Sequence, residues 1–258
     1  MRFQLAAART GLGALVLGAL AAAAAVIGVR LGRIDYALAY QVMTAAVVLG
    51  LIALAAALAW MRSALKRNDG TAKRTGLVVL VGSALLLYPP LSTIAHRLTA
   101  PPLNDVSTDT GNPPAFVALL KMRGPHDNSA LFDGNRQIRF QGETQSIAYA
   151  LHEKYPDVMK PHSGFAVGSK SPADTFYQRD LAAVQSLGWT IVETSEKDGR
   201  IEATTSSFWF ARPFDIVIRA RPAGPGARTD IRVQSRSDAL DDGASAGLIK
   251  HFLKVMQR

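Results

Sequence analysis

The residue types that could do chemistry in this sequence begin with arginines on two alternating segments. Arg219 and Arg221 alternate with apolar residues in one segment, Arg232 does so in the next, and Arg236 follows it. Guanidinium groups in a row suit bidentate recognition of phosphate or carboxylate. Anionic lipid headgroups or acidic envelope polymers are therefore candidate ligands. The alternative is a solvated face whose arginines pair across strands with acidic neighbours, namely Glu193, Glu202 and Asp230.

Carboxylates form a second set. Asp105 and Asp109 flank two hydroxyl residues and could bind a cation or a partner, although such runs often hydrogen-bond their own backbone. A calcium loop would need six to eight oxygen ligands. Together with Asp157 and His162 they define an alternative function, an envelope enzyme of hydrolase type with acid–base residues. Those groups would then have to converge within ~3 Å of a common point.

Several kinds of site are excluded by the residues that are absent. The chain has no cysteine, and its five histidines show no H-x-x-x-H spacing, so we expect no metal site. It has neither a G-x-S-x-G nucleophile elbow nor a phosphate-cradling glycine loop. We expect no cofactor and no catalytic residue, and binding is favoured over catalysis.

An aromatic run, Phe208-Trp209-Phe210, is the sharpest local feature. Neighbouring residues on a strand face opposite sides, so at least one ring is expected to point away from the core. Trp209 could then contact a membrane surface or anchor a protein partner. The alternative is that the hairpin tip folds back and buries these rings.

The first third of the chain is apolar and basic, with nine of the 29 Lys/Arg residues but two of the 20 acids in its first 96 residues. Three uncharged stretches are each about long enough for a helix to cross the ~30 Å hydrocarbon core. A Pro89-Pro90 pair predicts an exit or a kink in the third stretch. We expect transmembrane helices at about residues 10–29, 38–60 and 76–95, within a membrane region of residues 1–96.

Orientation follows from the basic residues. The amino end and the second loop together carry seven Lys/Arg residues, more than the opposite side, which predicts a cytoplasmic amino end. The rest of the chain would then lie outside, in the periplasm of a Gram-negative cell, with the protein a multi-pass inner-membrane protein. The apolar run continues through Val29, which favours an uncleaved first helix. Gly11, Gly13 and Gly18 predict close helix packing, in a bundle or between copies of the chain.

Residues 97–114 are rich in Pro, Asn, Asp, Ser and Thr and predict an extended linker, with the exported domain at 115–258. At the start of that domain we expect a short helix at 115–120, loops over 121–146 and a strand at 164–168. Regular periodicity follows. Helices are expected at 172–187 and about 241–256, and strands are expected between them at 189–192, 200–207, 214–221 and 229–235.

This order predicts an α+β fold. An antiparallel sheet of about four to five hairpin-linked strands has one apolar face, which two amphipathic helices would cover in a helix-grip-like arrangement. Ser171-Pro172 followed by Asp174 predicts the capped start of the first of these helices.

Several motifs taken together resemble a bacterial family, the domain of unknown function 1499. They are Asn104–Asp109 with Pro113-Pro114 and Phe116, Tyr155–Asp157, Gly188–Val192, Gly199–Thr204, Asp215–Arg219 and Ser235-Arg236. The resemblance spans roughly residues 104–257 and implies an exported domain behind membrane helices. The family has no established activity, so the resemblance implies location and fold.

The sequence therefore predicts a membrane-anchored periplasmic binding or scaffolding protein of the cell envelope. The expected contact residues are Trp209, Arg219, Arg232, Arg236, Asp105, Asp109 and Asp157. The expected partners are the lipid bilayer and an envelope protein or an anionic lipid or polymer. Nucleic acid is not expected, because the basic excess lies in the apolar third.

Overall fold

The computed structural model describes residues 2–160, 162–165, 171–237 and 241–257. The chain divides into two compact units. One consists of residues 1–95 with 208–211, and the other of residues 96–207 with 212–258. Of the strand expected at 164–168, residues 166–168 lie outside the described part of the chain.

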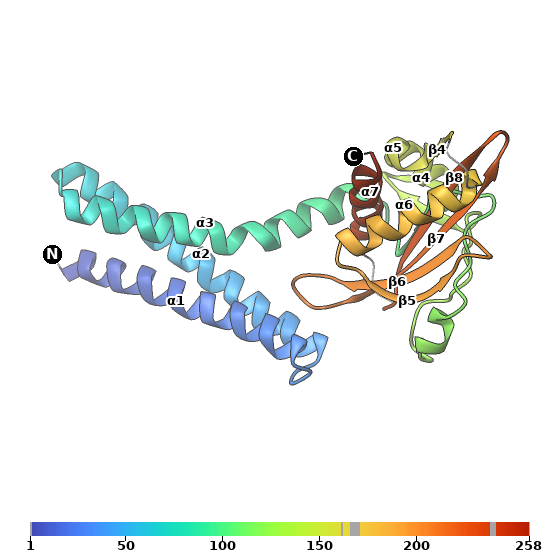
Figure 1. Cartoon of the computed structure of the whole chain (residues 1–258). Helices are drawn as coiled ribbons and strands as arrows, with labels where there is room; N and C mark the ends of the chain where they lie inside the picture. Colours follow the sequence, from blue (N-terminus) through green and yellow to red (C-terminus); the bar gives the residue numbers. More distant parts are fainter. Residues whose placement is uncertain (1, 161, 166–170, 238–240, 258) are drawn as a thin grey trace. The chain divides into compact units, whose positions relative to one another are not determined.

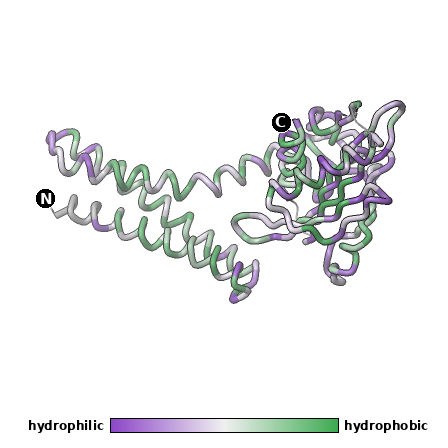
Figure 2. The backbone as a smooth tube through the Cα atoms, viewed as in Figure 1, coloured by the Kyte–Doolittle hydropathy of each residue, from purple (hydrophilic) through white to green (hydrophobic). Residues whose placement is uncertain are grey.

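Three long helices make up most of the first unit (Figure 1): α1 (Arg2–Arg30), α2 (Tyr36–Arg67) and α3 (Gly70–Thr99). All three are long and apolar enough to cross a membrane, over Arg9–Arg30, Tyr36–Arg67 and Gly70–His96. Figure 2 shows hydrophobic residues along much of their length. The Asp35 carboxylate caps α2 by accepting a hydrogen bond from the Leu38 amide.

Small residues bring these helices into close contact. A Cβ added at Gly18 would lie 2.9 Å from a Leu86 methyl carbon and 3.2 Å from the Ala46 carbonyl oxygen. A Cβ at Gly82 would lie 2.7 Å from a Leu15 methyl carbon. Of the predicted small residues, Gly11 and Gly18 therefore face neighbouring helices of the same chain, as small residues commonly do between membrane helices, whereas a Cβ at Gly13 would meet nothing within 4 Å.

The third helix differs from the prediction at its end. α3 continues through Pro89 and Pro90 to Thr99, so neither proline marks the helix exit. Each proline lacks the amide that would donate to the carbonyl four residues earlier, in Leu85 and Leu86. Membrane-spanning helices commonly tolerate such internal prolines.

The second unit is built on a six-stranded antiparallel sheet, confirming the α+β fold. Its strand order is β1-β8-β7-β6-β5, and β4 also pairs with β8, along the same strand as β1 but nearer the other end. The strands are β1 (Asp105–Ser107), β4 (His162–Gly164), β5 (Thr190–Ser195), β6 (Arg200–Ser206), β7 (Pro213–Ala223) and β8 (Gly226–Ser235).

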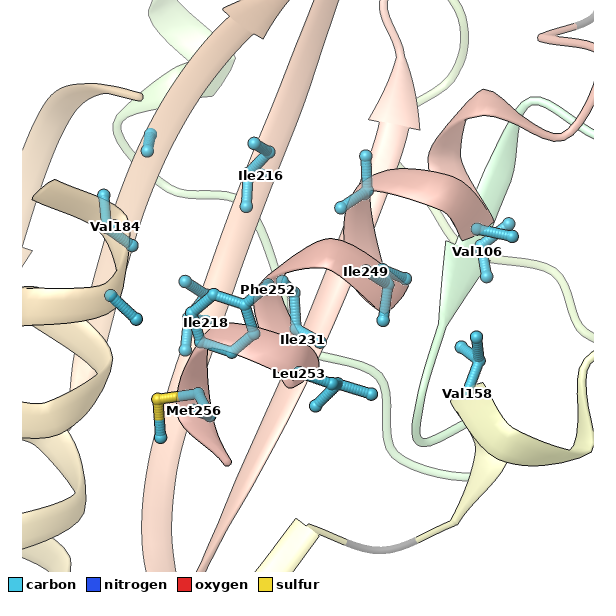
Figure 3. Packing of buried hydrophobic residues seen from close by; sticks show 14 of the residues in the cluster. Val106, Val158, Val184, Ile216, Ile218, Ile231, Ile249, Phe252, Leu253 and Met256 are labelled. Carbon is cyan, nitrogen blue, oxygen red and sulfur yellow. The ribbon is translucent and has the colours of Figure 1, made fainter. Parts of the chain in front are cut away.

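Helices α6 (Pro172–Ser186) and α7 (Ala244–Met256) cover one face of the sheet (Figure 1). The predicted cap is confirmed, because the Ser171 hydroxyl accepts a hydrogen bond from the Asp174 amide at 3.1 Å. The predicted alternation is confirmed as well, since Ile218 and Ile231 point into the core under α7 (Figure 3). Two shorter helices, α4 (Ile147–Lys154) and α5 (Pro156–Met159), extend this layer.

Three expectations for residues 97–146 are wrong. The extended linker does not continue to residue 114, because Asp105–Ser107 is the buried strand β1. The expected helix at 115–120 is instead a single 3-10 turn, η1 (Leu119–Met122). The expected loops contain a hairpin of β2 (Gln137–Phe140) and β3 (Glu143–Ser146). Strands of three or four residues are too short to show a period, and pairing partners decide them.

Candidate functional site

The face of the sheet opposite α6 and α7 carries the charged residues that alternation predicts. It is not an open surface, because residues 108–136 pass across it. Phe116 and Leu119 from this covering segment pack against Val217 of β7, and all three are buried. Side chains on this face therefore satisfy one another beneath a cover.

Arg232 and Asp105 form the most enclosed ion pair. Arg232 Nε donates to Asp105 Oδ1 at 2.9 Å, and Nη2 donates to Oδ2 at 2.6 Å. The arginine side chain is 2% exposed and also donates to the carbonyls of Pro114 and Ala130. Burial raises the pKa of Asp105 and outweighs the opposing effect of the Arg232 guanidinium. This pair fixes β1 and the covering segment to the sheet.

Glu202 anchors the covering segment from below. Its buried carboxylate accepts hydrogen bonds from the backbone amides of Val117, Ala118 and Leu119 at 2.9–3.1 Å. Arg200 Nε lies 3.0 Å from Glu202 Oε1 and balances the charge. Glu202 was expected as a solvated cross-strand partner, so its structural role here differs from the sequence prediction.

A second group centres on Asp230. Its carboxylate is fully buried and contacts Arg228 at 2.5 Å, Arg221 at 2.8 Å and Arg219 at 3.2 Å. Asp109 contacts Arg221 at 2.9 Å and accepts hydrogen bonds from two backbone amides of its own turn. Three partly exposed guanidiniums thus share two carboxylates. Of the predicted arginine row, Arg219 and Arg221 pair with Asp230 as the alternative interpretation expects, whereas Arg232 and Arg236 pair with other carboxylates.

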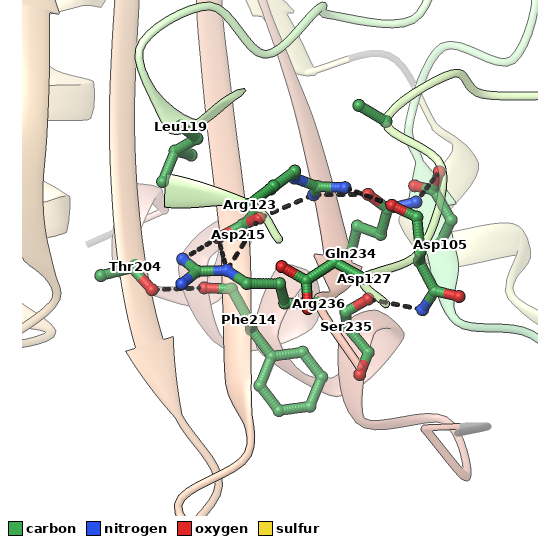
Figure 4. A network of polar contacts seen from close by, with 12 residues as sticks. Asp105, Leu119, Arg123, Asp127, Thr204, Phe214, Asp215, Gln234, Ser235 and Arg236 are labelled. Carbon is green, nitrogen blue, oxygen red and sulfur yellow. Dashed lines mark hydrogen bonds and ion pairs between the residues drawn. The ribbon is translucent and has the colours of Figure 1, made fainter. Parts of the chain in front are cut away.

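A third group centres on Asp215, which the sequence reasoning missed. Arg123 Nη2 lies 2.6 Å from Asp215 Oδ2, and Arg236 Nη2 lies 2.5 Å from Oδ1 (Figure 4). Arg123 also donates to Gln234, which in turn donates to Asp105. Two guanidiniums on one carboxylate leave this group with a formal charge of +1. Asp215 lies on the alternating face of β7, and that pattern was the signal that could have identified it.

A hollow of about 400 Å³ opens beside Arg236. Thr190 and Thr204 are register partners on neighbouring strands, and both line it. Ser206, Thr205, Met122 and Pro213 also contribute to its wall. The described hydrogen bonds of Arg236 to Asp215 use Nε and Nη2, which leaves Nη1 as the nitrogen for a ligand. The hollow therefore combines several hydroxyls with one cationic group.

The aromatic run lies in the loop between β6 and β7. The Phe208 side chain is 71% exposed and Trp209 is 37% exposed, whereas Phe214 is buried in the core. The rings of Phe208 and Trp209 meet edge to face with centroids 5.1 Å apart. The prediction that at least one ring lies away from the core is confirmed.

The four candidate acid–base residues do not converge. Asp105 and Asp109 lie on the polar face of the sheet in the ion pairs described above. Asp157 lies on α5 in the helical layer, exposed, with Lys160 2.8 Å away. His162 lies on β4 with its ring near Phe176 of α6, and burial lowers its pKa.

One buried carboxylate on the helical side was not predicted. Asp180 of α6 is fully buried and accepts hydrogen bonds from the Thr229 hydroxyl at 2.9 and 3.0 Å. Burial raises the pKa of Asp180 to about 8, and Arg179 opposes the shift. Asp180 lies on the buried face of α6, between Tyr177 and Val184. The sequence does not show its partner, because only the fold places it against Thr229 of β8.

Fold and site together define a class: an α+β domain whose sheet is gripped by helices, carried behind three apolar helices. A family model, "Protein of unknown function (DUF1499)", matches residues 105–256, and the chain belongs to this family. The match begins at β1, which supports counting that strand as part of the domain. A search of curated proteins finds no match.

Proposed function

We propose that this protein is a membrane-anchored binding module. α1–α3 hold it in the inner membrane with the amino end in the cytoplasm, and the α+β domain lies on the periplasmic side. The apolar length of the three helices supports the anchoring. The excess of Lys/Arg at the amino end and in the second loop supports the orientation.

The hollow beside Arg236 carries the proposal of binding. Arg123 and Arg236 outnumber their shared Asp215, so the base of the hollow favours an anion. Threonine and serine hydroxyls around it can donate to or accept from a hydroxylated ligand. The ligand class is therefore a small anionic group, phosphate or carboxylate, attached to a hydroxyl-bearing skeleton.

Binding fits this geometry better than the alternative of an envelope hydrolase. General acid–base catalysis needs its groups within hydrogen-bonding reach of one reacting site. Asp105 and Asp109 lie on one face of the sheet, whereas Asp157 lies on α5 in the layer on the other face and the His162 ring of β4 points toward α6 in that layer. Arg219, Arg232 and their carboxylates stabilise the polar face, whereas Arg236 lines the hollow.

A binding measurement tests the hollow. Glycerol 1-phosphate is titrated into the full chain in detergent and followed by calorimetry. Arg236→Gln should weaken binding at least tenfold, because a charge-assisted contact is lost. Arg139→Gln removes the same charge from the exposed hairpin β2–β3 and should leave binding unchanged. Equal binding by wild type and Arg236→Gln would contradict the proposed site.

A topology measurement tests the anchoring. Alkaline phosphatase, which is active when exported, and green fluorescent protein, which fluoresces in the cytosol, are each fused after Arg258. The proposal expects an active phosphatase and a dark fluorescent fusion. Fluorescence with inactive phosphatase would place the α+β domain in the cytosol and overturn the proposed location.

A further inference from the structure

The aromatic loop and the point where the chain enters the sheet lie at the same end of the sheet. The Ser235 amide donates to the Asn104 carbonyl at 2.8 Å, immediately before β1 begins. Ser235 is the register partner of Phe214, which in turn pairs with Thr205 near the end of β6. The segment that arrives from α3 and the loop that follows β6 therefore share one edge of the domain.

The connection from the membrane helix is short. α3 ends at Thr99 and β1 begins at Asp105. Six extended Cα–Cα steps span at most roughly 20 Å. This short connection limits how far the β1 end of the domain can lie from the end of α3, so a bilayer that α3 enters would be within reach of that end.

The loop at this edge holds its rings in a defined position. The Ser207 amide donates to the Arg212 carbonyl at 2.9 Å, and the Arg212 amide donates to the Ser207 hydroxyl at 3.0 Å. This closed loop presents Phe208 and Trp209, which are among the exposed large apolar side chains. Trp and other aromatic rings favour the boundary between lipid and water.

The charges around the loop suit an anionic lipid. Residues 203–214 include one arginine and no acidic residue. Ser206 and Pro213 flank the loop and also line the hollow beside Arg236. The loop that carries the aromatic rings therefore leaves the sheet from the wall of the cationic hollow, an order that matches the neighbouring tail region and headgroup of a lipid.

We propose that the Phe208–Trp209 loop inserts into the interface of the bilayer that anchors α1–α3, and that the hollow receives the headgroup of an anionic phospholipid. This inference rests on the proposed function and names its ligand. Phosphate and glycerol hydroxyls of such a headgroup match the guanidinium and hydroxyls of the hollow.

Loop insertion is tested by spin labelling, for which the absence of cysteine is an advantage. Phe208→Cys and Leu131→Cys are labelled separately in the full chain within nanodiscs of phosphatidylcholine and phosphatidylglycerol. Leu131 is exposed on the covering segment and serves as the matched control. The ratio of oxygen to water-soluble nickel collisions should be severalfold higher at position 208 than at position 131. Equal, water-like ratios at both positions would contradict insertion into the bilayer. The exposed rings would then be assigned to contact with a protein partner.

Lipid selection is tested separately. The full chain is extracted from nanodiscs that contain both lipids, and the ratio of co-purified phosphatidylglycerol to phosphatidylcholine is measured. This ratio should exceed that of the nanodiscs. It should fall severalfold with Arg236→Gln and stay unchanged with Arg139→Gln. Ser206→Ala, an exposed change in the wall of the hollow, gives a second variant that should fold normally and reduce retention. Binding of soluble glycerol 1-phosphate without lipid preference would overturn this inference but leave the proposed function standing.

Discussion

On one face of the central sheet Ile218 and Ile231 pack under α7, and on the other Arg232 and Glu202 are buried just as deeply beneath residues 108–136. Ile231 and Arg232 are neighbours on β8 and point to opposite faces. The first face is closed by apolar burial, which is non-directional. The second is closed by ion pairs and hydrogen bonds, which require defined partners at defined distances.

This difference between the two faces determines which substitutions each of them tolerates. An apolar core accepts conservative changes of shape at modest cost. A buried charge network loses much more when one partner is removed, because the other is left without compensation. The polar face also leaves Arg236, one member of its arginine-rich group around Asp215, in the wall of the hollow.

The largest expected effect comes from breaking the network at its most enclosed pair. Arg232→Met leaves the Asp105 carboxylate buried and unpaired and should lower the free energy of unfolding by about 3–5 kcal/mol. Urea unfolding of the full chain in detergent, followed by intrinsic fluorescence, measures it. The loss of unfolding free energy in the double variant Asp105→Leu with Arg232→Met should be smaller than the sum of the losses in the two single variants. Simple additivity would mean that the two side chains do not act as a pair.

The helical face can be probed through Asp180, a buried carboxylate whose pKa burial raises strongly. Folded Asp180, with a pKa of about 8, keeps its proton up to about pH 8, whereas the unfolded group, with an ordinary pKa of 3.8, loses it near pH 4. The folded state binds more protons between these values, so the stability falls as the pH rises, by at most about 1.4 kcal/mol per pH unit. Thermal unfolding from pH 5 to 9 measures the slope. Asp180→Asn should remove this contribution, and an unchanged slope would show that another group causes it.

A conservative change at the neighbouring position sharpens the contrast with Arg232. Ile231→Val removes one methylene group from the apolar core and should cost about 0.5–1.5 kcal/mol. The same urea titration at low and high salt should give the same value, since no charge is involved. A loss as large as that of Arg232→Met would contradict the distinction between the two faces.

The smallest effect is expected at an exposed ion pair. Asp157 and Lys160 are both largely solvent-exposed. Lys160 lowers the pKa of Asp157, but solvent screens such a pair. Asp157→Asn should leave the unfolding midpoint unchanged within experimental error. A clear shift would mean that this carboxylate takes part in an interaction that the described contacts do not include.

Much of the architecture was predictable where a period persists over many residues. Three uncharged stretches predicted α1–α3, and alternation along β7 and β8 assigned Ile218 and Arg219 to opposite faces. Ser171 and Asp174 located the start of α6. These features depend on local spacing, which the sequence contains in full.

The candidate site was predictable only in part. Arg236 and Trp209 were identified from residue type. That Arg236 lines the hollow, and that the loop with Trp209 starts at the same end of the sheet, depends on strand register. Asp215 and Asp180 were missed as site residues, because strand alternation and helical spacing indicate the face on which each lies but not its partners. The arginine row was expected at the surface, and its cover was not foreseen.

By itself the sequence determined the membrane-directed apolar third, the α+β order and the alternation of the strands, since each follows from composition or from a period of 3.6 or 2. The tertiary structure alone decided that β1 joins the sheet and that Asp105 meets Arg232. It also decided that the aromatic loop lies at the end of the sheet where Asn104 precedes β1. These are contacts between residues roughly 100 or more positions apart or in very short segments, and only the folded chain brings such residues together.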